Sequence, residues 1–129
     1  MDHCPKILIR FIQPENHRYS TCGDWLYDAE SHTVEVRVSL MGDWRSELAV
    51  AIHEALEAVA CVAADVSEVD VTVFDELFNR AEHNDNEEPG DDPKAPYHKQ
   101  HVAATAVEKS VCQSLELYWD FHENMVFES

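Results

Sequence analysis

The stretch Ser46-Glu-Leu-Ala-Val-Ala-Ile-His-Glu-Ala-Leu-Glu-Ala-Val-Ala60 decides how this chain folds. Its apolar residues recur at helical spacing as far as about Ala64, and Asp43 or Ser46 can cap the start of the helix. Apolar residues occupy most of the circumference: Leu48, Ala49, Ile52, Ala55, Leu56, Val59 and Ala60. Because such a helix is buried on most sides, we expect it at the centre of the molecule.

Upstream of this helix the sequence predicts three short strands. Residues 6–12 (Lys-Ile-Leu-Ile-Arg-Phe-Ile) are rich in branched side chains, and residues 24–27 and 33–38 flank a polar turn. In residues 33–38 valines alternate with polar residues. This period of two buries one face of a strand and exposes the other to solvent. We therefore expect one small antiparallel or mixed sheet.

Downstream, two more helices and an aromatic tail are predicted. Ser67 can cap a helix with this apolar face: Val69, Val73, Phe74, Leu77 and Phe78. Another helix should begin near Pro96 and run to about Leu115. Residues 117–127 should form a short helix or tail that packs back on the sheet. The order of these elements predicts an α+β fold, with a sheet followed by three main helices, in a single domain spanning residues 1–129.

The amino-acid composition limits the classes of function that the protein can have. The chain has 129 residues and a formal net charge of -17, from 26 acidic and 9 basic side chains. This charge opposes direct binding to nucleic-acid phosphates or to an anionic membrane, and no apolar run approaches the ~20 residues that cross a bilayer. The start of the chain lacks the features of a secretory signal, and the four cysteines are scattered. We expect a cytoplasmic protein with Cys61 and Cys112 as buried thiols.

The predicted central helix carries the motif His53-Glu54-Ala55-Leu56-Glu57. His53 and Glu57 are four residues apart and project from one face, and Glu54 lies about 100° around the helix from His53. In an HExxH helix the two outer residues bind zinc, and the intervening glutamate activates a zinc-bound water. The HExxE variant keeps this chemistry, because carboxylate oxygens and imidazole nitrogens both bind zinc at about 2.0–2.2 Å.

A catalytic zinc needs a third protein ligand, and the helix after Pro96 offers two candidates. His98 and His101 span one turn, and we favour His101 because it shares a face with Thr105 and Glu108. Those two residues would orient a metal ligand through outer hydrogen bonds. The predicted ligands of Zn²⁺, or of another divalent metal, are His53, Glu57 and His101. Two arrangements without metal stay open: an exposed pair on the first helix, and a hydrogen-bonded core network.

The segment from 82 to 93 is acidic and has almost no apolar side chain, which predicts a long loop. Its second half, Glu88-Pro-Gly-Asp-Asp-Pro93, leads directly into the helix that carries His101. Prolines stiffen the loop and Gly90 permits a turn. We expect the loop to be either the rim or lid of a cleft, or a solvated connector.

Several motifs are informative together: Gly23-Asp24-Trp25, Met41-Gly42-Asp43-Trp44, His53-Glu54 with Glu57, Glu88 to Pro93, and Ala95-Pro96-Tyr97 followed by His101. They resemble a family of small uncharacterised proteins common in bacteriophages and prophages, over most of the chain. The resemblance implies no particular activity, and a phage origin would place the protein in the host-cell cytoplasm. The order of strands and HExx helix is also loosely similar to the zincin metallopeptidases, which have a histidine where this chain has Glu57. It implies a zincin-like fold.

Two functions from different classes are expected. The first is a zinc-dependent hydrolase or metallopeptidase of zincin-like type that acts on an unidentified substrate. Glu54 would be its general base, and Tyr97 or His98 would donate to the developing oxyanion. The alternative is an acidic binding or inhibitor protein that imitates DNA and occupies a host protein without catalysis.

Overall fold

The computed structural model describes residues 3–81 and 87–128. Within them three strands, β1 (Lys6–Ile12), β2 (Gly23–Asp28) and β3 (Thr33–Ser39), come first. Four α-helices follow in the same described residues: α1 (Trp44–Ala63), α2 (Glu68–Arg80), α3 (His98–Ser114) and α4 (Trp119–Glu128). Short 3-10 turns lie at η1 (Pro14–Asn16) and η2 (Pro89–Asp91). The predicted α+β class is confirmed, and α4 occupies the aromatic tail.

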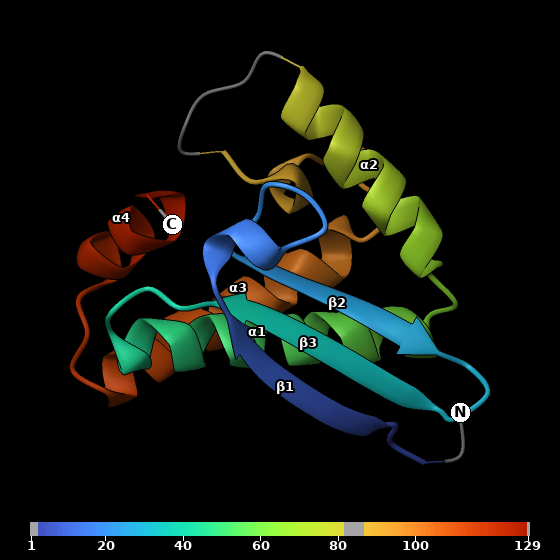
Figure 1. Ribbon diagram of the computed structural model, residues 1–129, viewed down its shortest axis with the longest axis horizontal. Coiled ribbons are helices and arrows are strands. Elements are labelled where there is room, and N and C mark those ends of the chain that lie inside the picture. The colour runs from blue at the N-terminus through green and yellow to red at the C-terminus, as the bar shows by residue number, and fades with distance from the viewer. Residues whose placement is uncertain (1–2, 82–86, 129) are drawn as a thin grey trace.

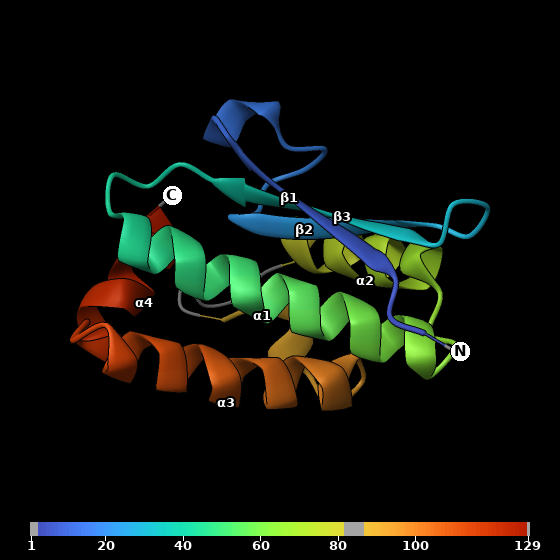
Figure 2. The same cartoon turned by 90° about the horizontal axis from the view of Figure 1, so that it is seen from below.

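The sheet, α1 and α3 form three layers in that order, as Figure 2 shows. In Figure 1, α2 and α4 lie toward opposite ends of α1. The middle position of α1 explains why its sequence is apolar on most sides. Three of its alanines are completely buried: Ala49, Ala51 and Ala58. Their small side chains allow the neighbouring layers to approach α1 closely.

The sheet is mixed, with strand order β1-β3-β2. β1 runs parallel to β3 and β2 runs antiparallel to it. Val34, Val36 and Val38 of the central strand are completely buried and belong to the same core cluster as Val50 and Ala51 of α1. The alternating valines therefore set which face of the sheet packs on α1.

Side-chain caps start two of the helices as the sequence predicts. Asp43 caps α1, and its Oδ1 accepts a hydrogen bond of 3.0 Å from the Arg45 backbone N–H. Ser67 caps α2, and its Oγ accepts one of 3.2 Å from the Val69 N–H. Ser46, the alternative cap of α1, is instead completely buried within the helix.

The predicted apolar face of α2 is only partly correct, because the helix is rotated about its axis so that Phe74 of that face packs on the core while its valines and leucine do not. Val69, Val73 and Leu77 are exposed, whereas Val71 is buried and Phe74 is half-buried. Asp75 also points inward, where it accepts hydrogen bonds from two tyrosines. These polar contacts turn α2 away from the orientation that its apolar residues alone would favour.

The prediction that residues 117–127 pack back on the sheet is also wrong, because α4 packs mainly on α1 and α3. His122 of α4 is completely buried and contacts Ser46 of α1 and Glu108 of α3.

Cys61 and Cys112 are buried free thiols, as predicted. Across residues 3–81 and 87–128, no helix combines the length and apolar character that crossing a bilayer requires.

Close packing of α3 should make Ala104→Leu destabilising. Ala104 is completely buried, and three additional carbons have no space there. We expect the free energy of unfolding to fall by about 1–3 kcal/mol in urea titrations. The neighbouring Ala103 is exposed, so Ala103→Leu should change it by less than about 0.5 kcal/mol. Equal effects of the two substitutions would contradict the three-layer packing.

Candidate metal centre

The three predicted ligands come together between α1 and α3. His53 and Glu57 project from α1 and His101 from α3, and all three are buried. Glu57 Oε2 lies 3.0 Å from His53 Nε2 and 3.1 Å from His101 Nδ1. One ligand atom from each residue lies within 4.8 Å of the other two. Tetrahedral zinc separates its ligand atoms by about 3.3 Å, so small adjustments would accommodate the ion.

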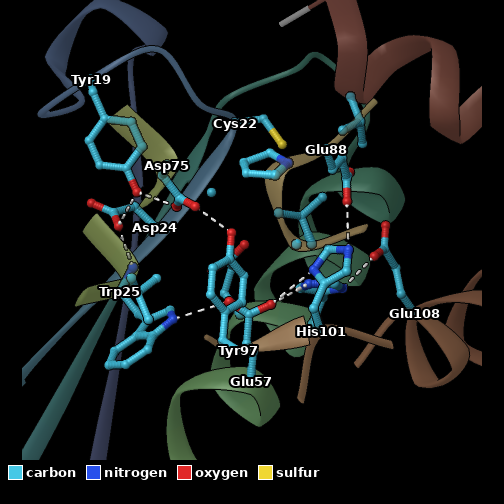
Figure 3. Close-up of a pocket in the computed structure, with 18 residues that line it drawn as sticks. Tyr19, Cys22, Asp24, Trp25, Glu57, Asp75, Glu88, Tyr97, His101 and Glu108 are labelled. Carbon is cyan, nitrogen blue, oxygen red and sulfur yellow. Dashed lines mark hydrogen bonds and ion pairs between the residues drawn. The ribbon is translucent and has the colours of Figure 1, made fainter. Parts of the chain in front are cut away.

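The carboxylate of Glu57 is held at both oxygens. Its Oε1 accepts a hydrogen bond of 3.2 Å from the indole N–H of Trp25, while Oε2 faces the two imidazoles (Figure 3). Burial raises the pKa of Glu57, but the bonds to His101 and His53 outweigh burial and lower the pKa to about 2. Glu57 is therefore an anion, with one oxygen fixed by β2 and the other available to a cation.

Each histidine has its second nitrogen against an outer carboxylate. His53 Nδ1 lies 2.8 Å from Glu108 Oε1, an ion-pair contact whose angle is poor for a hydrogen bond. His101 Nε2 lies 3.1 Å from both Asp91 Oδ1 and Glu88 Oε2. An outer carboxylate favours a proton on the nitrogen that it faces. In a neutral imidazole the inner nitrogen then carries the lone pair that a metal requires.

Glu108 belongs to a longer buried chain of polar side chains that includes a residue the sequence did not reveal. Its Oε2 lies 2.5 Å from His122 Nε2, and His122 Nδ1 lies 3.0 Å from Ser46 Oγ. Burial raises the pKa of Glu108, but its hydrogen bond to His122 and its ion-pair contact with His53 lower it overall. The chain therefore anchors the outer partner of His53 to α4. No spacing rule distinguishes His122 from other histidines in polar sequence.

Glu54 lines the same cavity as the predicted ligands. It packs so closely on Gly23 that a Cβ at that glycine would lie 2.9 Å from Glu54 Oε1. Burial, followed by the negative charge of Glu57, raises the pKa of Glu54 well above its ordinary value. A nearby cation would act in the opposite direction and favour the carboxylate form.

The other predicted residues have different surroundings. Tyr97 lines the cavity, but its hydroxyl donates to Asp75. His98 does not line the cavity, and its Nδ1 donates to the Gly90 carbonyl at 2.8 Å. Thr105 Oγ1 is buried without a hydrogen-bond partner among the described residues. The structure therefore groups Tyr97 with the site and leaves His98 outside it.

A second polar cluster forms the wall of the cavity opposite His101 (Figure 3). The Tyr19 hydroxyl lies 2.9 Å from Asp75 and 3.2 Å from Asp24. Arg18 holds Asp24 with two hydrogen bonds, of 2.8 and 3.0 Å. Burial raises the pKa of Asp75 to about 6.

The described end of the acidic loop forms part of the cavity. Glu88, Pro89 and Gly90 line it, and a Cβ at Gly90 would lie 2.3 Å from His101 Cγ. Glycine is therefore required for this close approach of the backbone to the imidazole. Residues 82–86 of the predicted loop lie outside the described part of the chain.

The cavity has a volume of about 80 Å³, enough for an ion with a few waters. Six of the chain's 26 acidic residues line it, and none of the described lining residues is lysine or arginine. The six are Asp24, Glu54, Glu57, Asp75, Glu88 and Glu108. Such a concentration of carboxylates creates a field that attracts cations.

Comparisons with known proteins identify no relative. No protein-family model, curated protein or solved structure matches the chain. The resemblances to phage proteins and to zincins, which short motifs carry, therefore stay predictions.

Without metal, the stability of the protein should decrease as pH rises from about 7 to 8. Burial lowers the pKa of His101, but bonds to Asp91, Glu57 and Glu88 raise it to about 12, while an unfolded histidine titrates near 6.5. The stabilisation is complete below the unfolded pKa and is lost as pH rises toward the folded one. Between pH 7 and 8, His101 keeps its proton in the folded protein, whereas in the unfolded chain it has largely lost it.

The variant His101→Gln should therefore flatten this pH dependence. Removal of one retained proton makes the slope of unfolding free energy against pH shallower by up to about 1.4 kcal/mol per pH unit. Urea titrations in the presence of a chelator at several pH values measure both slopes. Identical slopes for the wild type and the variant would contradict a protonated, carboxylate-bound His101.

Proposed function

We propose that the protein is a metal-dependent hydrolase, with Zn²⁺ held by His53, Glu57 and His101. One observation carries the proposal: two imidazole nitrogens and a carboxylate oxygen, on buried side chains of two helices, converge at one cavity. Three protein ligands on a tetrahedral ion leave one position for water or substrate. Structural zinc sites, by contrast, commonly have four protein ligands.

Two features favour a metal over a hydrogen-bonded core network. The outer nitrogen of each histidine faces a carboxylate, which is the usual arrangement around metal-binding imidazoles. The cavity also has an excess of carboxylates over the histidines that could neutralise them. Burial and the charge of Glu57 keep the pKa of Glu54 well above its ordinary value, and a divalent cation beside it would offset the cost of its carboxylate form.

Zinc would supply acidity, because it lowers the pKa of a bound water from 15.7 toward about 7. Glu54 follows His53 on α1 and lines the cavity, and it would accept the proton released during hydrolysis. Tyr97 is the remaining candidate for a donor to a substrate oxygen, although that oxygen would compete with Asp75 for the phenol proton. His98 has no part in this scheme, since it lies outside the cavity.

The charge of -17 is compatible with the alternative, a DNA-mimicking inhibitor. Mimicry of a phosphate backbone requires carboxylates at the surface. Six of the chain's 26 acidic residues line one small cavity, where a mimic has no use for them. We therefore favour the hydrolase, in which these six residues have a role.

Metal analysis tests the proposed ligands. The purified protein should bind about one equivalent of zinc, and His53→Ala should bind it at least about tenfold more weakly, because a ligand is lost. Elemental analysis after dialysis against a zinc buffer, together with titration by Co²⁺ followed by visible absorption, measures both. His98→Ala is the matched control and should bind like the wild type. Equal binding by all three proteins would exclude the proposed ligand set.

Catalysis is tested separately with Glu54→Gln, which removes the proposed base but none of the ligands. The variant should retain zinc and lose at least about 10²-fold in rate on any peptide, ester or amide that the zinc-loaded wild type hydrolyses. Asp70→Asn, an exposed change on α2, should leave the rate unchanged. Zinc-dependent turnover at full rate in Glu54→Gln would assign the base elsewhere.

A further inference from the structure

β1 is an edge strand with one free side. It pairs with β3, and in the described part of the chain no strand pairs with its other edge. Figure 2 views the molecule from that side, and none of the helices and strands in the described residues lies in front of β1. The outward backbone N–H and C=O groups of such an edge can pair with another strand.

The inner face of β1 is apolar but incompletely covered. The register places Ile7, Ile9 and Phe11 opposite the three valines of β3, so these residues share the face that packs on α1. The valines are completely buried, whereas Ile7, Ile9 and Phe11 are 38%, 42% and 45% exposed. α1 therefore covers the middle of the sheet and leaves the inner face of the edge strand β1 partly exposed. Exposed apolar side chains that adjoin one another mark interaction surfaces.

Charge makes β1 suitable for contact with another copy of this acidic chain. Residues 3–13 contain no aspartate or glutamate, although the whole chain has a charge of -17. Of the two cations on the strand, Arg10 is neutralised by Glu35, since its Nε lies 2.7 Å from Glu35 Oε1. The other, Lys6, lies at the end of the strand. An approaching β1 would therefore meet little like charge along the contact.

We propose that two copies pair through antiparallel β1 strands about a twofold axis at Ile9, to form a continuous six-stranded sheet. In this register Ile9 lies opposite the partner's Ile9, and Ile7 lies opposite the partner's Phe11. Leu8 lies opposite the partner's Arg10, so no charged residue directly faces another. A second copy suits this edge because the apolar positions of β1 are symmetric about Ile9, and a twofold contact closes at a dimer.

Formation of the dimer does not depend on the proposed hydrolase function. The metal cavity is lined by Asp24 and Trp25 of β2, the strand at the opposite edge of the sheet from β1. Zinc binding and dimerisation can therefore succeed or fail separately. Loss of metal ligands should leave the oligomeric state unchanged.

Sedimentation velocity at protein concentrations of about 5 to 100 µM tests the association. The wild type should form a dimer that dissociates on dilution and that strengthens with salt, because salt screens repulsion between two chains of charge -17. Ile9→Lys places two like charges at the axis and should give a monomer. Val73→Lys changes a comparably exposed apolar residue of α2, 49% exposed against 42%, and should remain dimeric.

Cysteine cross-linking tests the register. Cα atoms of directly opposed residues lie about 4.5–5.5 Å apart, within the roughly 4.4–6.8 Å that a disulfide spans, so under mild oxidation Ile9→Cys should form an interchain disulfide. Phe11→Cys should do so at least about tenfold more slowly, because it faces Ile7 of the partner subunit. Both variants are made with Cys4→Ser, which removes an exposed thiol near the strand. A wild-type monomer at 100 µM, a dimer unaffected by Ile9→Lys, or equal cross-linking by both cysteines would overturn the proposal.

Discussion

The arrangement of the molecule depends on one buried carboxylate, that of Glu57. It lies on α1, accepts a hydrogen bond from Trp25 of the sheet, and faces His101 of α3. A single side chain thus connects the three layers through polar contacts. A buried anion is tolerated only when its oxygens are satisfied, so Glu57 constrains the positions of the groups around it. Apolar packing brings the layers together, and this carboxylate restricts how they align.

The same requirement accounts for the positions of the outer helices. α2 presents Asp75 to the interior and leaves Val69 and Leu77 in solvent, because Asp75 meets two tyrosine hydroxyls at the cavity wall. α4 is fixed through His122, which contacts α1 and α3. The satisfaction of buried polar groups therefore decides the orientation of both helices, and in α2 it prevails over the burial of Val69, Val73 and Leu77. The fold around the cavity is therefore organised by polar contacts as much as by apolar burial.

Periodicity predicted those parts of the structure that depend on neighbours in sequence. Helical spacing identified α1, alternation identified the buried face of β3, and the four-residue interval placed His53 and Glu57 together. The face that His101 shares with Glu108 lines the cavity, whereas His98 does not. Contacts that join distant segments were not predictable in this way. Trp25 and Glu57 are 32 residues apart, and Ser46 and His122 are 76 apart. Such pairs depend on how whole elements pack.

Protons and a metal ion would compete for the same buried groups. In the metal-free protein, the raised pKa values of His53 and His101 mean that protonated imidazoles balance part of the carboxylate charge. If a divalent ion binds as proposed, these protons must leave, because a metal requires the nitrogen lone pair. Metal affinity then rises with pH over the same interval in which the metal-free fold loses stability. The protein can remain folded both with protonated histidines and with a bound metal, since each form supplies a positive charge beside Glu57.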